Sequence, residues 1–252
     1  METGCRRAIL FLLFSPLFGT GFAQTETPVK VDKPLKSYSH WYFGAEYGVP
    51  FLFGDFTSFS ADKTYVGSQF GGFAGYQVNS WIGIEASART GYTRMGAKSY
   101  AGDYLMNADG MTYYTNQDFN TWKYKDVFSK VHFTNIGLQM NLNVNNFFGP
   151  NRGNRRWTVL LSPAVYAQHF STELINKADK SPLSGKKTDK WNIGIGGDVS
   201  LRYKISRAFD VQLRTGIIWV NNNKMDGIST LIKSKDHFMT SAGLSLIWKV
   251  GK

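Results

Sequence analysis

Residues 81–92 read WIGIEASARTGY, and apolar and polar side chains alternate along them. Ile84 and Ala88 fall on one side of this alternation, and Glu85 and Arg89 fall on the other. Successive side chains of a β-strand point to opposite faces of the sheet. The stretch therefore predicts a strand with one apolar face and one charged face.

Seven further segments repeat this alternation, and the gaps between the segments are long and short in turn. The short gaps follow the second, fourth and sixth segments, at Asn79-Ser80, Asn145–Arg155 and Ser206-Arg207. Pro50 is expected to end the first strand because proline cannot donate to the ladder. Pro163 is expected to require a bulge or a missing ladder bond inside the fifth. The eight predicted strands are residues 38–49, 66–78, 81–92, 131–143, 156–169, 191–203, 209–220 and 238–250.

The placement of aromatic residues distinguishes two kinds of barrel. A soluble, ligand-carrying barrel turns its apolar face inward, whereas a membrane barrel turns that face toward lipid. Aromatic residues make up 15% of the chain and gather near the ends of the apolar faces, as they do at the two interfaces of a bilayer. The sequence therefore predicts an all-β fold, an eight-stranded antiparallel up-and-down transmembrane β-barrel. The expected interface residues are Trp41, Tyr76, Trp81, Tyr92, Trp157, Trp191, Tyr203, Trp219 and Trp248.

The N-terminal region predicts export. Arg6 and Arg7 precede an apolar run at residues 8–18 that is too short to span a bilayer as a helix. We expect a signal peptide at residues 1–23, a periplasmic tail at residues 24–37 and a barrel domain at residues 38–252. Cys5 is the only cysteine and would leave with the signal peptide, so no disulfide or thiol chemistry is expected in the mature chain.

The chain has a formal net charge of +11. Such an excess suits contact with the phosphates of anionic lipids. No nucleic-acid recognition motif accompanies it, so nucleic acid is not an expected partner. His40, His132 and His237 show no metal-ligand spacing, and neither a metal nor a cofactor is predicted.

The eight-strand pattern and the final segment Gly243–Val250 together resemble the outer-membrane protein A/X type of small barrel. The pair Ala23-Gln24 resembles the cleavage site of exported Bacteroidetes proteins. The resemblance implies the outer membrane of a Gram-negative bacterium as the location. It also implies outer-membrane lipids, lipopolysaccharide and the barrel-assembly machinery as partners.

The polar faces of the predicted strands carry charges of both signs. The interior of an eight-stranded barrel is just wide enough for side chains to fill it. We therefore expect an ion-pair network in the lumen, and a narrow gated channel is the alternative. The residues of this network are Glu46, Glu85, Arg89, Asp198, Arg202, Asp210, Arg214 and Lys249.

The long loops are the expected place of function, because binding residues concentrate on loops. The second long loop combines aromatic and polar residues, which suit contact with an extracellular protein or glycan, or alternatively continue two strands above the membrane. Phenylalanines of the first loop are expected to cap the barrel mouth or to enter the outer leaflet, and lysines of the third to contact lipopolysaccharide. The aromatic residues expected to make this surface contact are Tyr100, Tyr104, Tyr113, Tyr114, Trp122 and Tyr124.

One segment also suggests catalysis. His169 and Ser171 share a lipid-facing side, with Glu173 nearby, and this resembles the His-x-Ser arrangement of outer-membrane lipid A deacylases. The sequence favours a non-enzymatic protein with a structural or surface-interaction role through its extracellular loops. The alternatives are a lipid A-modifying hydrolase, a small gated porin and a periplasmic lipid-binding barrel.

Overall fold

The computed structural model describes residues 40–113, 121–147, 155–183, 188–221, 225–228 and 237–250. Eight long strands close into an antiparallel barrel, and three short strands form a separate small sheet. The barrel strands are β1 (His40–Phe53), β2 (Ser68–Gln77), β3 (Ile82–Gly96), β7 (Val127–Asn143), β8 (Trp157–Asn176), β9 (Thr188–Lys204), β10 (Phe209–Val220) and β11 (His237–Val250). The remaining elements are β4 (Leu105–Asn107), β5 (Thr112–Tyr113), β6 (Thr121–Lys123), η1 (Ser99–Ala101), η2 (Tyr124–Asp126) and α1 (Val144–Phe147).

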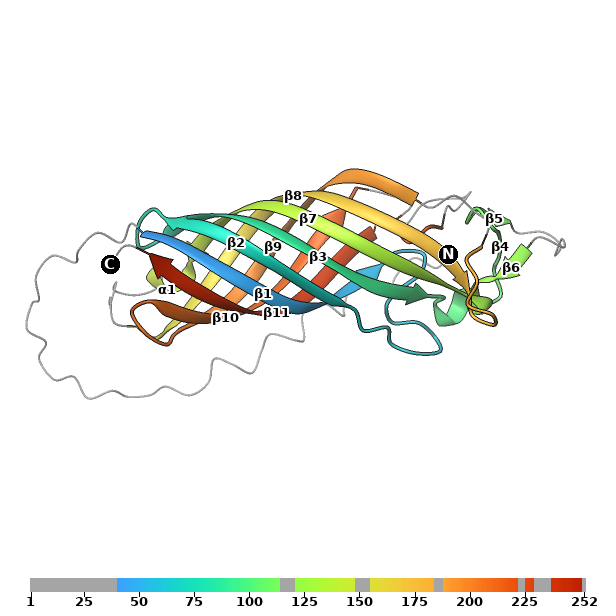
Figure 1. Cartoon of the computed structure of the whole chain (residues 1–252), viewed down its shortest axis with the longest axis horizontal. Coiled ribbons are helices and arrows are strands. Elements are labelled where there is room, and N and C mark those ends of the chain that lie inside the picture. The colour runs from blue at the N-terminus through green and yellow to red at the C-terminus, as the bar shows by residue number, and fades with distance from the viewer. Residues whose placement is uncertain are drawn as a thin grey trace, which may run out of the picture. The chain divides into compact units, whose positions relative to one another are not determined.

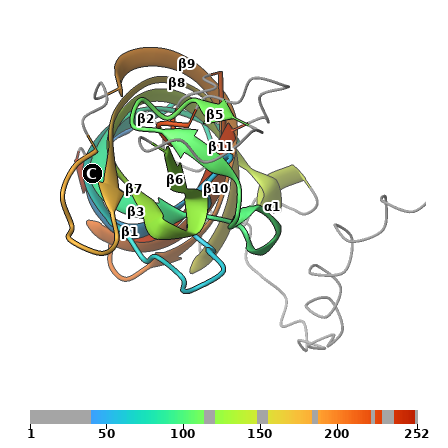
Figure 2. The same cartoon turned by 90° about the vertical axis from the view of Figure 1, so that its right-hand side faces the viewer.

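The barrel order is β1-β11-β10-β9-β8-β7-β3-β2, so each strand pairs with its neighbours in sequence and β1 closes against β11. The short connections lie at the end where β1 begins and β11 ends (Figure 1). The small sheet β4–β6 lies at the opposite end, and Figure 2 looks onto it. In transmembrane barrels the end with the long loops is extracellular. The long connections, loops 1 to 4 in chain order, are residues 54–67, 97–126, 177–187 and 221–236.

Within the described ranges no helix is long and apolar enough to cross a bilayer.

Apolar side chains point outward and polar side chains point inward along the barrel. Ile193 and Leu244 are 70% and 59% exposed, whereas Glu85 and Arg89 are 0% and 3% exposed. Outward aromatic rings stand about ten residues apart on a strand, as at Trp41 and Phe51 of β1 or Phe209 and Trp219 of β10, which is the length of a membrane-crossing strand. The predicted fold class, a transmembrane β-barrel, is confirmed, and the soluble lipid-binding barrel is wrong.

Several strands are longer than predicted at the extracellular end. The β7–β8 ladder continues to the pair Val127↔Asn176, and β9 begins at Thr188 instead of residue 191. The inward positions of this extension carry Val127, Phe170 and other apolar residues that pack against the loops. The loops therefore supply a core that keeps these strands paired beyond the membrane.

Of the two predictions made for prolines, the one for Pro50 is wrong and the one for Pro163 is confirmed in one of its two forms. The prediction that Pro50 ends β1 is wrong, because β1 continues to Phe53. Pairing with β2 stops at Gly48, so Pro50 keeps a partner strand only in β11, and an edge of this kind tolerates a residue without an N–H donor. Opposite Pro163 the β7–β8 ladder is interrupted with unchanged register, which is the missing ladder bond and not a bulge.

Candidate functional site

A network of buried ion pairs crosses the lumen. Arg89 binds Glu46 at 3.2 Å and Asp198 at 3.1 Å. Arg214 binds Glu85 at 2.8 Å, Glu46 at 3.4 Å and Asp198 at 3.9 Å. These five side chains are at most 3% exposed and come from β1, β3, β9 and β10. The two guanidinium groups therefore connect opposite walls of the barrel.

Neutral polar groups complete the hydrogen bonding of the buried carboxylates. The Tyr42 hydroxyl donates to Glu85 at 3.0 Å, and the amides of Gln139 and Asn141 donate to it at 2.9 and 3.0 Å. Ser162 donates in turn to Asn141 at 2.6 Å. Buried charges are tolerated when they are both paired and hydrogen-bonded, and Glu85 meets both conditions.

The other predicted lumen charges lie toward the periplasmic end. Arg202 stacks over the Tyr42 ring at 5.1 Å and donates to Gln212 at 2.9 Å. Lys249 and Asp210 form a pair at 2.7 Å. The eight predicted lumen residues thus comprise four carboxylates and four cations, all on the inward face. Their charges cancel, which limits the electrostatic cost of placing them inside a membrane.

Two glycines of β2 let β1 and β3 meet inside the barrel. Gly71 lies between Glu46 and Arg89 in the strand register, and Gly75 lies next to Tyr42. A Cβ on Gly75 would stand 2.2 Å from the Tyr42 ring, and one on Gly71 would stand 2.9 Å from the Arg89 side chain. Any larger residue would displace these lumen side chains, so the close approach requires glycine at both positions.

An apolar cluster of strand and loop residues lies at the extracellular end of the barrel. We call this buried cluster the mouth core, and all four long loops contribute to it. Loop 4 is also bound to the wall, because Ser129 donates to the carbonyl of Asp226, and Thr172 to that of Met225 at 2.6 Å. The loop residues of the mouth core are Phe56, Ala97, Ala101, Met106, Tyr124, Leu183, Met225 and Ile228.

The predicted aromatic residues of the second loop do not form one surface. Tyr100 and Tyr104 are 60% and 43% exposed, but Tyr124 is 2% exposed and Trp122 packs against the mouth core. The assignment of Tyr124 to the interaction surface is therefore wrong, because its ring packs edge-on against Phe56. Of the two others, Tyr113 lies in β5 and Tyr114 lies outside the described residues.

The phenylalanines predicted for the first loop divide into two groups. Phe56 caps the mouth from inside, whereas the rings of Phe51 and Phe53 at the end of β1 pack against Phe59 on the outer face. Phe56 therefore matches the predicted cap of the barrel mouth, whereas entry of the other rings into the outer leaflet stays a prediction.

One ion pair among the described residues connects loop 1 to loop 3 outside the membrane. Lys177 of loop 3 binds Asp62 of loop 1 at 2.9 Å. Burial raises the pKa of the Asp62 carboxyl, but hydrogen bonds from Ser60 and Lys177 outweigh it and hold that pKa below its usual range. Partial burial raises the pKa of Tyr65 to about 12.

Of the remaining lysines predicted for the third loop, Lys180 and Lys190 are exposed and Lys186 and Lys187 lie outside the described residues.

His169 and Ser171 face outward from β8, as predicted from their parity. The Nε2 atom of His169 binds the carboxylate of Asp189, which lies opposite Ser171 on β9. Glu173, the carboxylate expected to orient His169, lies opposite Lys130 instead. The orienting carboxylate is therefore Asp189, which the sequence pattern did not indicate because it belongs to the next strand.

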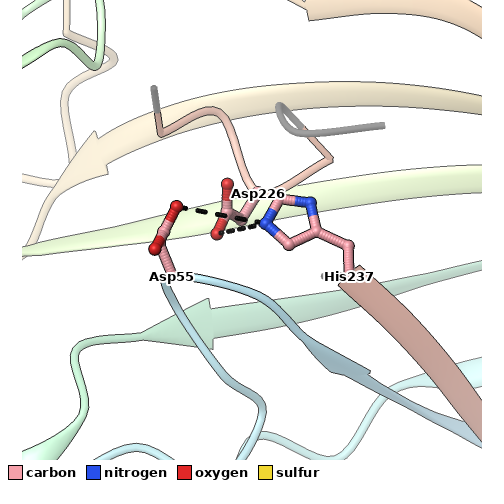
Figure 3. A group of neighbouring side chains, drawn as sticks. All are labelled: Asp55, Asp226 and His237. Atoms are coloured by element: carbon pink, nitrogen blue, oxygen red, sulfur yellow. Dashed lines mark ion pairs between the residues drawn. The ribbon is translucent and has the colours of Figure 1, made fainter. Parts of the chain in front are cut away.

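A second group of titratable residues was missed altogether. Asp55 of loop 1, Asp226 of loop 4 and His237 at the start of β11 point toward one another inside the extracellular end (Figure 3). His237 Nε2 stands 3.8 Å from an Asp226 oxygen and 4.0 Å from an Asp55 oxygen. No local spacing could reveal them, because only closure of the barrel brings β1 beside β11.

The outward apolar surface and the filled, charge-balanced lumen define a transmembrane β-barrel of eight strands. No protein-family model and no curated protein sequence matches the chain. Among solved structures, it is similar to Neisserial surface protein A, at 12% identity over 83% of this chain and 97% of that one, with a TM-score of 0.47.

The chain is also similar to a major outer membrane protein from Thermus thermophilus, at 12% identity over 83% of this chain and 99% of that one, with a TM-score of 0.47. A third similar structure is that of Ail, the attachment invasion locus protein of Yersinia pestis. It is 10% identical over 84% of this chain and 99% of that one, with a TM-score of 0.44. The closed barrel of eight antiparallel strands confirms, for the fold, the resemblance expected from the sequence. The Bacteroidetes type stays a prediction.

Replacement of Arg214 by Met should strongly destabilise the barrel. The change leaves three buried carboxylates without one of their cations, and breaking a buried pair in this way costs about 3–5 kcal/mol. Denaturant unfolding in lipid vesicles, followed by tryptophan fluorescence, measures the loss. Arg156→Met is the control because Arg156 is exposed. Equal stability of the two variants would contradict a network centred on Arg214.

Proposed function

We propose that the chain is a non-enzymatic, non-conducting outer-membrane protein of a Gram-negative bacterium, and that it acts through its extracellular surface. The observation that carries this proposal is the filled lumen. Arg89 and Arg214 bridge the inner half, and the mouth core fills the outer half. With the interior occupied along the described ranges, interaction with partners falls to the loops and the extended strand ends.

The extracellular surface offers two kinds of contact. Tyr100 and Tyr104 present exposed rings beside the small sheet, and tyrosine supplies a large contact area at low entropic cost. Arg94 and Lys130 face one another on the outward side of β3 and β7, above the ring of Tyr92. The rings suit an extracellular protein or glycan, and the cations suit phosphates of lipopolysaccharide.

The proposal includes the expected processing. The signal peptide at residues 1–23 would direct export, and the final strand β11 would be the segment presented to the barrel-assembly machinery. Support for this role of β11 comes from its position, because it closes the barrel against β1 along their whole length.

Planar bilayers containing the folded chain should show no stepwise conductance. Ion passage would require Arg89 and Arg214 to leave their carboxylates and the mouth core to open, and both changes expose buried groups. The measurement is single-channel recording at both polarities, with a general porin as positive control. Reproducible steps that disappear after heat denaturation would instead support the gated porin.

Combined Tyr100→Ser and Tyr104→Ser replacement should weaken surface binding by about tenfold or more, as expected when exposed aromatic anchors are lost. Cells displaying the chain would be tested on arrayed glycans and immobilised extracellular proteins. Phe59→Ser is the matched control, since Phe59 is an exposed ring of another loop. Binding that survives the double change but not the control would move the interaction surface to loop 1.

A second candidate function rests on the contact between His169 and Asp189. A carboxylate that orients a histidine beside a serine is the arrangement that activates serine for attack on esters. Ser171 lies directly opposite Asp189, and all three side chains face outward near the outer interface. An acyl ester of a lipid in the outer leaflet is the substrate class that could reach them.

Lipid A profiles test this candidate. If it holds, expression of the chain removes an acyl chain from lipid A by mass spectrometry, and Ser171→Ala and Asp189→Asn abolish the change. Ser181→Ala is the control because Ser181 lies in loop 3, beyond the end of the strand that carries His169. A profile identical to that of cells lacking the chain would remove the hydrolase.

A further inference from the structure

Three buried titratable residues at the extracellular end have no role in the lumen network or in the proposed interaction surface. Asp55, Asp226 and His237 are 9%, 0% and 1% exposed. One ligand atom of each lies within 4.8 Å of the others. They come from loop 1, loop 4 and the first residue of β11, and Figure 3 shows both carboxylates facing the imidazole.

The histidine lacks hydrogen bonds inside this group. Neither ring nitrogen of His237 has a hydrogen-bond partner among the described residues. Its Nε2 atom faces the Asp226 and Asp55 carboxylates at 3.8 and 4.0 Å, beyond the length of a hydrogen bond. A buried imidazole within ion-pair distance of two carboxylates but hydrogen-bonded to neither is unusual in a folded protein and points to a ligand between them.

The separations suit a bridging metal ion. Zinc binds histidine nitrogen at about 2.0–2.1 Å and carboxylate oxygen at about 2.0–2.2 Å. Two such ligands at a tetrahedral angle stand about 3.3–3.5 Å apart, by the geometry of those bonds. The two spacings around His237, 3.8 and 4.0 Å, exceed this by about 0.3–0.7 Å, and the three ligand atoms lie within 4.8 Å of one another, so side-chain rotation would draw them onto the ion.

The surroundings hold the ligand atoms in place. The backbone N–H of Phe56 donates to Oδ2 of Asp226 at 2.9 Å, and that of Ile228 donates to Oδ1 at 3.0 Å, so the carboxylate is oriented as metal ligands usually are. A Cβ on Gly54 would stand 2.7 Å from Oδ2 of Asp226 and 2.8 Å from Nε2 of His237. Only glycine at this position leaves room for the group.

We propose that Asp55, Asp226 and His237 form a site for a divalent transition-metal ion, with zinc the best match. Zinc accepts imidazole nitrogen, a borderline ligand, as well as the harder carboxylate oxygen, and three protein ligands with water in the fourth position are common for this ion. The ion would join loop 1 and loop 4 to β11 and so close the barrel mouth. The site is independent of the loop surface and of the Ser171 arrangement.

The test is metal binding by the folded full chain, purified without a histidine tag and freed of metal with EDTA. Titration with Zn²⁺ should give one ion per chain and raise the unfolding temperature by several degrees, since an ion that binds only the native state stabilises it. His237→Gln and Asp55→Asn should each weaken binding at least about tenfold. His132→Gln, which alters an exposed histidine, should bind as the unaltered chain does.

X-ray absorption of the zinc-loaded, unaltered chain gives a readout that does not depend on variant folding. The expected spectrum shows one imidazole among oxygen ligands. Binding below one ion per chain, a spectrum without imidazole, or a His237→Gln variant that binds zinc normally would each overturn the site. The three residues would then be a buried ion-pair cluster only.

Discussion

Buried charge inside a narrow barrel must be satisfied by other side chains, and this requirement governs the architecture. An eight-stranded barrel encloses only the space that side chains can fill, so a charged inward residue has no bulk water to solvate it. Arg89 and Arg214 meet this constraint by binding carboxylates on opposite walls. Gly71 leaves room for Arg89, and Gly75 leaves room for Tyr42, which donates to Glu85. The packing of the lumen between opposite walls thus follows from this one requirement.

The alternation of side chains was enough to predict the membrane part. A period of two assigns each residue to a face, and the sign of the inward residues makes pairing between Arg89 and a carboxylate necessary. The pattern could not indicate which carboxylate, because Asp198 lies 109 positions away and meets Arg89 only across the closed lumen. The same reason explains why Asp189 was missed as the partner of His169.

In the extracellular part of the barrel, the alternation of polar and apolar residues no longer separates inside from outside. There both the wall and the loops bury apolar residues, so Phe170 of β8 and Phe56 of loop 1 belong to one core, and alternation no longer marks the strand end. Tyr124 was assigned to the surface from composition alone, whereas its neighbours place it inside. Loop residues can be sorted into core and surface only when the opposing loops are known.

The polar network and the mouth core are expected to differ in how well they tolerate amino-acid substitutions. The inner half is a polar network in which each member binds several others, so a change at Arg214 affects Glu46, Glu85 and Asp198 together. The mouth core is apolar, and such cores accept replacements that keep the total volume. Loop sequences can therefore vary at constant volume while the inner network keeps the barrel intact. Asp226 is the exception, because its backbone contacts and its place beside His237 tie loop 4 to specific partners.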